Sequence, residues 1–231
     1  MKVYGCLYIC PTPIGNLKDI TIRVLETIKE VDYLACEDSR RALKLLNSFS
    51  IKKPLIVFNE YNKLKSSEKI IHLLKEGKNV AFTCDAGMPV IADSGINIIS
   101  DCIKEGIKVT VLPGPSAVIT ALVGSNIECN NFVFVNFMPR KRNKIISILE
   151  KIKEMDYTAC AFESPYRLLK TLDIMYNFDS NLFISVCREM TKLHEEFFSD
   201  RIEKVIEHFK DKKIKGEITI VFKFLEDNDE K

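Results

Sequence analysis

Residues 80–103, VAFTCDAGMPVIADSGINIISDCI, contain the loop around which the chain is organised. The apolar run at 80–82 predicts a short buried strand, and the apolar positions at 96–103 predict a helix. The loop between them is rich in glycine and proline, with Asp85 near its start and Asp93 near its end. In open parallel sheets, ligands bind at such loops, outside the carboxyl ends of the strands.

The chemistry of this loop narrows the class of ligand. It contains neither the GxGxxG nor the GxxxxGK[ST] pattern that cradles phosphates. Two carboxylates would repel a phosphate, whereas they suit hydroxyl groups or an ammonium group. The alternative, an ordinary turn with two solvated aspartates, stays open on this stretch alone.

The composition excludes some classes of protein. With 231 residues, 46% of them hydrophobic, the chain can bury one large core or two small ones. The net charge of +2 produces no global field for nucleic acid, so such a partner would need a local basic patch. The eight cysteines form no CxxC pair and the chain has three histidines, so we expect reduced core thiols, a cytoplasmic protein and no metal site.

Neither export nor membrane insertion is expected. Pro11 and Pro13 interrupt the N-terminal apolar run, and no small-residue cleavage site follows, so no signal peptide is predicted. The uncharged stretch 109–127 approaches the length of a membrane span, but its PGP turn at 113–115 favours a strand, a turn and a helix.

Hydrophobic periodicity predicts alternating strands and helices in the first half of the chain. Asp19 is the expected N-cap of the first helix, Ser66 or Ser67 that of the third, and Ser116 that of the fifth. The predicted strands are 6–10, 33–36, 55–58, 80–82 and 109–112, and the predicted helices are 20–31, 43–49, 66–75, 96–103 and 117–123.

The second half repeats this alternation after a polar stretch at 124–131. We therefore predict an N-terminal α/β domain, 1–124, and a C-terminal α/β domain, 125–231, and a cleft between two such halves is a common site for a small molecule. The charged tail, 226–231, is expected to fray. The predicted strands are 132–137, 157–162, 182–187 and 218–224, and the predicted helices are 145–152, 168–176 and 202–210.

Seven short motifs, taken in order, resemble the tetrapyrrole methylase superfamily and, within it, the members that methylate ribosomal RNA. The resemblance extends from about residue 7 to residue 224 and rests on the joint order and spacing of the motifs. They are TPIGNL at 12–17, EDSR at 37–40, DAGMP at 85–89, PGPSA at 113–117, FES at 162–164, REMTK at 188–192 and KGE at 215–217.

The resemblance implies a fold, a cofactor and a reaction. S-adenosylmethionine would bind in the cleft between two α/β domains of a homodimeric protein. The reaction would be methylation of the ribose 2′-hydroxyl of a cytidine in the decoding region of 16S rRNA, with free rRNA or the small ribosomal subunit as substrate. Neither DNA nor a membrane is implied as a partner.

The same resemblance implies which residues line the cofactor. Gly87 would let backbone groups approach closely because it has no side chain. The helix start expected at residues 116–117 would present the N–H groups of a first helical turn, which suit a carboxylate or a ring acceptor. The residues implied are Pro13, Asp85, Ala86, Gly87, Asp93, Ser116, Ala117 and Glu163.

Methyl transfer to a hydroxyl is an in-line displacement, in which alignment contributes on the order of 7–11 kcal/mol. A general base adds about 10²- to 10⁴-fold, and burial would raise the pKa of a carboxylate and make it a better base. Two alternatives stay open: the acidic residues at 37–38 merely pair with the arginines at 40–41, or water takes the proton. The candidate bases are Glu37, Asp38, Asp93 and Glu163.

The basic loop at 138–144 is the clearest candidate contact with RNA, since Lys and Arg near phosphates supply affinity. A second basic cluster lies at 212–215, and Tyr61 and Tyr166 are suited to stacking on a splayed base. A solvated charged face is the alternative. The expected RNA contacts are Arg40, Arg140, Lys141, Arg142, Lys144 and Arg188.

Two other functions stay open. One is a methylase of tetrapyrroles or other small molecules, although those relatives usually begin with a Gly-Pro-Gly-Asp type of loop where this chain has TPIG. The other is a ribosome-assembly binder without catalysis. A nicotinamide dehydrogenase is disfavoured by the missing glycine pattern, and a nucleoside triphosphatase by the missing phosphate-loop lysine.

Overall fold

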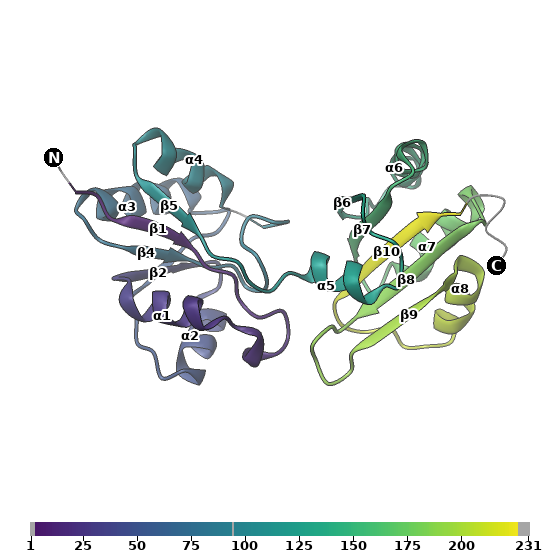
Figure 1. Ribbon diagram of the computed structural model, residues 1–231, viewed down its shortest axis with the longest axis horizontal. Helices are drawn as coiled ribbons and strands as arrows, with labels where there is room; N and C mark the ends of the chain where they lie inside the picture. The colour runs from purple at the N-terminus through teal and green to yellow at the C-terminus, as the bar shows by residue number, and fades with distance from the viewer. Residues whose placement is uncertain (1–2, 94, 226–231) are drawn as a thin grey trace. The chain divides into compact units, whose positions relative to one another are not determined.

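The computed structural model describes residues 3–93 and 95–225, and the chain divides into two compact units, Met1–Ser116 and Ala117–Lys231 (Figure 1). The sequence analysis placed this division at 124/125. In the structure, α5 (Ala117–Gly124) packs against β7 (Thr158–Glu163) and β10 (Ile218–Phe224). The Ala121 carbonyl on α5 also accepts a hydrogen bond from Cys187 Sγ at 3.8 Å. The division therefore precedes α5.

The first unit contains a sheet of five parallel strands in the order β3-β2-β4-β1-β5. Because these strands run in one direction, their carboxyl ends meet at one edge of the sheet, and the loops that follow them share that edge. The strands are β1 (Cys6–Ile9), β2 (Tyr33–Cys36), β3 (Leu55–Val57), β4 (Val80–Phe82) and β5 (Lys108–Val111).

Helices cover both faces of this sheet, α1 (Ile22–Glu30) and α2 (Ser39–Ser48) on one and α3 (Lys63–Lys75) and α4 (Ile96–Lys104) on the other (Figure 1). Strand β4 serves both cores. Ala81 belongs to the core formed with α1 and α2, whereas Val80 and Phe82 belong to the core formed with α3 and α4. A strand buried on both faces is apolar throughout, which is the pattern that the sequence displays.

The second unit contains a mixed sheet in the order β6-β7-β10-β8-β9. Only β6 and β7 are parallel, and β10 runs antiparallel to both β7 and β8. In consequence β7 and β8 end at the same edge, where Ile218 pairs with both Glu163 and Arg188. The remaining strands are β6 (Phe132–Phe137), β8 (Leu182–Arg188) and β9 (Glu196–Arg201), and the helices are α6 (Arg142–Met155), α7 (Leu168–Phe178) and α8 (Ile202–Lys210).

The expected α/β alternation is confirmed, but one strand was not predicted. Strand β9, EFFSDR, pairs with β8 at the edge of its sheet and has no buried position. An edge strand with only two apolar residues carries too weak a periodicity to be recognised. The tail at 226–231 lies outside the described residues.

Four helices begin elsewhere than predicted, among them α2, which begins at Ser39 and not at residue 43. Thr21, not Asp19, caps α1, since its Oγ1 accepts from the Val24 N–H at 3.2 Å. Helix α3 begins at Lys63, so Ser66 and Ser67 are buried within it, and Ser66 Oγ donates to the Val57 carbonyl at 2.8 Å. Helix α6 begins at Arg142, which places part of the predicted basic loop in a helical turn.

No helix among residues 3–93 and 95–225 has the length and apolarity needed to cross a membrane. The uncharged stretch at 109–127 divides into β5, a turn and α5, as its PGP turn predicted.

The Thr21 cap provides a test of the local fold. Thr21→Ala should lower the free energy of unfolding by about 1 kcal/mol, because the Val24 N–H loses its acceptor. Glu26→Ala, at an exposed position of the same helix, should change it by less than about 0.5 kcal/mol. Urea unfolding of the two variants beside the wild type measures both, and equal losses would refute the capping role.

Candidate active site

The loop after β4 is joined to the loop after β1 at the carboxyl edge of the first sheet. Thr12 and Gly87 form an isolated antiparallel bridge, in which each N–H donates to the other's carbonyl at 2.9 Å. Thr12 Oγ1 also donates to the Cys84 carbonyl at 3.2 Å. Gly87 has φ +80°, a conformation that side-chain-bearing residues rarely adopt.

The PGPSA turn joins the same region. A Cβ added to Gly87 would lie 3.9 Å from the Pro115 carbonyl, and one added to Gly114 would meet the Pro11 ring at 2.4 Å. The structure thus brings together the loops that carry Pro13, residues 85–87 and residues 113–115. Three of the motifs that were recognised in the sequence meet at this edge.

The far half of the central loop is strained. Val90 has φ 78° and Ala92 has φ 64°, both in the left-handed region that β-branched residues in particular avoid. Each such residue costs on the order of 1–3 kcal/mol, and strain of this kind gathers at ligand sites. Gly95 follows with φ +127°, where a Cβ would lie 2.9 Å from the Phe82 ring. The chain therefore has to be held in this path by its surroundings.

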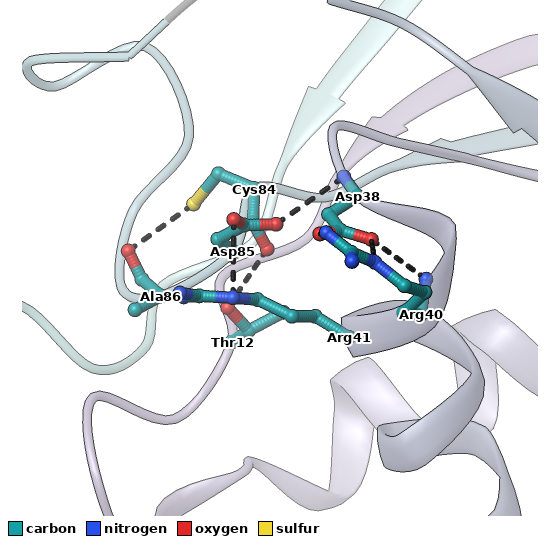
Figure 2. A network of polar contacts seen from close by, with 7 residues as sticks. All are labelled: Thr12, Asp38, Arg40, Arg41, Cys84, Asp85 and Ala86. Carbon is teal, nitrogen blue, oxygen red and sulfur yellow. Dashed lines mark hydrogen bonds and ion pairs between the residues drawn. The ribbon is translucent and has the colours of Figure 1, made fainter.

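Two arginines each neutralise a different aspartate at the edge (Figure 2). Asp38 caps α2 and receives the Arg40 N–H at 2.8 Å and the Arg40 guanidinium at 2.6 Å. These hydrogen bonds lower the pKa of Asp38 to about 2. Asp85 is 3.4 Å from Arg41 Nε and accepts from the Asp38 N–H at 3.3 Å. The pairing considered for residues 37–38 with Arg40 or Arg41 therefore holds for Asp38 alone, and the partner of Arg41 is Asp85.

Glu37 is different. Within the part of the chain that the structure describes, its carboxylate makes no hydrogen bond or salt bridge. Partial burial raises its pKa, the negative charges of Asp85 and Asp93 raise it further, and Arg41 opposes the rise. A carboxylate in this condition holds a proton more readily than a fully solvated glutamate does.

A cavity of about 410 Å³ opens beside these groups. It is lined by residues 37–40 after β2, by Val57 and Asn59 at the end of β3, and by Asp85 after β4. Asn59 was not among the predicted site residues. Its Oδ1 accepts from the N–H groups of Tyr61 and Asn62, so it shapes the wall of the cavity by closing the turn after β3.

Asp93, the second aspartate of the central loop, also has a raised pKa. Loss of surrounding water raises it, a hydrogen bond with Cys84 opposes the rise, and the charge of Asp85 adds to it. Ser94, the next residue, lies outside the described residues. The charge of Asp93 also raises the pKa of Glu37 directly, and the charge of Asp85 raises the pKa of both.

The predicted site residues of the second unit lie in different surroundings. Glu163 is buried, and its carboxylate contacts Arg167, Ser164 and Thr171. Arg188 is paired with Glu196 at 2.9 Å. The exposed cations, by contrast, form no ion pair with any residue in 3–93 or 95–225: Arg140, Lys141, Arg142 and Lys144.

Thiols and metal ligands offer no further chemistry among the described residues. All eight cysteines are free and seven of them are buried. Burial raises the pKa of Cys10 to about 12 and that of Cys36 to about 11, so these thiols stay protonated. The described residues contain no group of three or more His, Cys, Asp or Glu side chains suited to a metal ion.

A family model of the tetrapyrrole (corrin/porphyrin) methylases matches residues 6–206. The chain belongs to this family. It is 48% identical over 94% of its length to the "Ribosomal RNA small subunit methyltransferase I" of Thermotoga maritima, covering 97% of that protein. Proteins of the same name from Halalkalibacterium halodurans and Bacillus subtilis are 41% and 42% identical over 98% and 94% of this chain, covering 78% and 74% of their own lengths.

Solved structures show the same fold at low sequence identity. A diphthine synthase superposes with a TM-score of 0.70 at 16% identity, covering 94% of this chain and 89% of that one. A cobalt precorrin-4 methyltransferase gives a TM-score of 0.70 at 16% identity, with 94% of each chain covered. The protein is an S-adenosylmethionine-dependent methyltransferase of the tetrapyrrole methylase fold.

The coupling between Glu37 and Asp85 can be measured directly. Asp85→Asn should lower the pKa of Glu37, because it removes a neighbouring negative charge and leaves Arg41 free to stabilise the ionised carboxylate. Glu60→Gln should lower it less, since Glu60 is the weakest of the charges that raise this pKa. Titration of labelled glutamate carboxyl carbons by NMR reports both, and an unchanged Glu37 pKa in Asp85→Asn would contradict the assignment.

Proposed function

We propose that this methyltransferase acts on the ribose 2′-hydroxyl of a cytidine in the decoding region of 16S rRNA. Its relatives named "Ribosomal RNA small subunit methyltransferase I" are 36–48% identical over nearly the whole chain. The structural observation that carries the proposal is Glu37, a carboxylate with a raised pKa in a cavity beside the glycine-containing loop. A general base of this kind accelerates reaction at a hydroxyl nucleophile by about 10²- to 10⁴-fold.

The residues at the first sheet's edge fit S-adenosylmethionine. The Thr12–Gly87 bridge joins the loops after β1 and β4, and a Cβ at the buried Gly87 would lie 3.4 Å from Ile14 Cγ2. Asp85 and Asp93 supply acceptors for hydroxyl or ammonium groups. S-adenosylmethionine, when bound, supplies a methyl group on a sulfonium, which is an electrophilic carbon. The proposed lining is Pro13, Asp85, Ala86, Gly87, Asp93, Ser116 and Ala117.

Among the candidate bases, Glu37 is the best suited. It would accept the proton of the ribose hydroxyl as the oxygen bonds to the methyl carbon. Asp38 is held by Arg40, and a pKa of about 2 makes it a weak base. Asp93, whose pKa is also raised, is the second candidate. Alignment would contribute on the order of 7–11 kcal/mol, and the base a further 10²- to 10⁴-fold in rate, roughly.

The basic residues at 140–144 are proposed to contact RNA phosphates. Lys141 is the N-cap of α6, and Arg142 and Lys144 lie in its first turn. Cations at a helix N-terminus oppose the helix dipole, so this arrangement lowers stability unless an anion binds there. Arg40, whose side chain is 89% exposed, is a further candidate although it pairs with Asp38. Arg188 is more constrained, because Glu196 already neutralises it.

We also propose that the protein is a cytoplasmic homodimer. The buried, protonated thiols suit a reducing compartment. Large apolar side chains are exposed on α5 and at the end of β6, with Val123 77% exposed and Phe137 56% exposed. We propose these exposed apolar side chains as part of the interface between two copies. Sedimentation of the wild type and of the Val123→Glu variant tests the homodimer: the wild type should sediment as a dimer and the variant as a monomer.

The substrate can be identified in one experiment. Methyl groups from radiolabelled S-adenosylmethionine should appear on small ribosomal subunits that lack this modification, at a ribose 2′-oxygen of one decoding-region cytidine. Free 16S rRNA, tested in parallel, separates the two forms of the substrate. An absence of label on both, with the cofactor bound, would contradict the proposal and favour a small-molecule methylase or a binder without catalysis.

The role of Glu37 predicts a specific loss. Glu37→Gln should reduce the rate of methyl transfer by about 10²- to 10⁴-fold while cofactor affinity stays within about twofold of the wild type. Glu60→Gln, which alters an exposed glutamate paired with Lys63, should transfer methyl groups at the wild-type rate. Full activity in Glu37→Gln would mean that Asp93 or water, and not Glu37, accepts the proton of the ribose hydroxyl.

A further inference from the structure

Glu163 occupies the last position of β7, and its side chain is completely buried. One carboxylate oxygen accepts from the Ser164 N–H at 2.6 Å and lies 2.5 Å from Arg167 Nη2. The other accepts from Thr171 Oγ1 at 2.5 Å. A carboxylate with three donors and no exposed surface is badly placed to take a proton from a substrate. Its contacts are those of a group that holds others in position.

Arg167 carries this restraint to a second loop. Its Nη1 donates to the Met138 carbonyl at 3.1 Å. Met138 is 1% exposed and its own N–H donates to the Phe162 carbonyl at 2.9 Å. Because Met138 directly precedes the basic segment, defined here as residues 139–144, this carbonyl is where the segment is attached to the rest of the second unit.

The basic segment needs such an attachment for two reasons. First, its four cations repel one another, and none of them has an acidic partner among the described residues. Second, the pairing of β6 with β7 is interrupted just before the segment, with a register shift between Phe134 and Phe137 and with Asn136 at φ 63°. Beyond this shift, the sheet holds the start of the segment only through the Phe137–Phe162 pair and the Met138 N–H bond to the Phe162 carbonyl.

We infer that Glu163 is a positioning residue, which acts through Arg167 and the Met138 carbonyl to hold the basic segment in the conformation that contacts RNA phosphates. This inference rests on the proposed function. It assigns to Glu163 a role in binding the substrate RNA, in place of the catalytic and cofactor-binding roles implied by the sequence.

In the Glu163→Gln variant, a purely electrostatic effect and a loss of positioning would change KM in opposite directions. Glu163→Gln removes a negative charge close to the basic segment, so electrostatics alone would strengthen RNA binding and lower KM for small subunits. The positioning role predicts a KM about tenfold higher with kcat near the wild-type value, because the charge-assisted contact with Arg167 is lost. Affinity for S-adenosylmethionine should stay unchanged.

A second pair of variants covers the case in which Glu163→Gln folds poorly. Arg167→Lys keeps the positive charge, but a single ammonium group lacks the planar fork that reaches Glu163 and Met138 together. Arg167→Lys and Arg167→Met should therefore raise KM to a similar extent. A wild-type KM for Arg167→Lys would make Arg167 a simple phosphate contact and overturn the inference.

A matched control lies between α6 and the end of α7. Lys153 and Asp179 form a salt bridge of 2.6 Å there, and Asp179→Asn removes it without touching Met138. This variant should keep the wild-type KM. If it raises KM as much as Glu163→Gln does, any loosening of α6 suffices and the specific role of Glu163 is refuted.

Hydrogen exchange separates this inference from the proposed function. In Glu163→Gln and Arg167→Lys, amides at 138–145 should exchange faster than in the wild type, with or without RNA. If the wild type methylates no rRNA, the proposed function fails, while exchange still reports on the restraint itself. Unchanged exchange at these amides would overturn the inference even if rRNA methylation is observed.

Discussion

Parallel pairing within the first sheet is the constraint on which the proposed site depends. β4 lies between β1 and β2, and the pairing continues just beyond the strands: the Cys10 N–H bonds to the Phe82 carbonyl and the Thr83 N–H to the Ala35 carbonyl. The loops that follow these strands therefore emerge side by side at the carboxyl edge of the sheet. A glycine bridge and an acidic cluster that are separated by almost fifty residues in the chain are consequently neighbours in space, before any side chain contributes.

Side-chain pairing then gives similar carboxylates different properties. Asp38 and Asp85 each face an arginine, whereas Glu37 is partly buried and faces the negative charges of Asp85 and Asp93. The two arginines differ in their effect on Glu37. Arg41, which pairs with Asp85, lowers the pKa of Glu37 and so opposes the rise that the charge of Asp85 produces, whereas Arg40 is occupied by Asp38. Loss of the Arg41 charge would therefore raise the pKa of Glu37.

The elements could be predicted largely from the sequence, because strands buried on both faces and amphipathic helices have clear periodicities. Predictions of elements failed for two reasons. Strand β9 was missed because it has few apolar residues and so a weak periodicity. Ser66 was predicted as a helix cap because the sequence does not reveal its hydrogen bond to the Val57 carbonyl. For the candidate site, the sequence predicted which residues lie near one another but not which of them pair. The sequence placed Glu37 and Asp38 together, but could not tell which arginine pairs with which aspartate, since Arg41 reaches Asp85 across the sheet edge.

Glu37 and Glu163 illustrate why burial alone does not identify a base. Both follow or end an apolar strand, and the sequence offers no reason to separate them. Glu163 is the more deeply buried, yet an arginine one helical turn further along the chain and two further donors occupy its oxygens. Arg40 and Arg41, the corresponding arginines after β2, bind Asp38 and Asp85 instead and leave Glu37 without a donor among the residues that the structure describes. Whether a carboxylate can act as a base thus depends on whether the nearest arginine pairs with it or with another carboxylate.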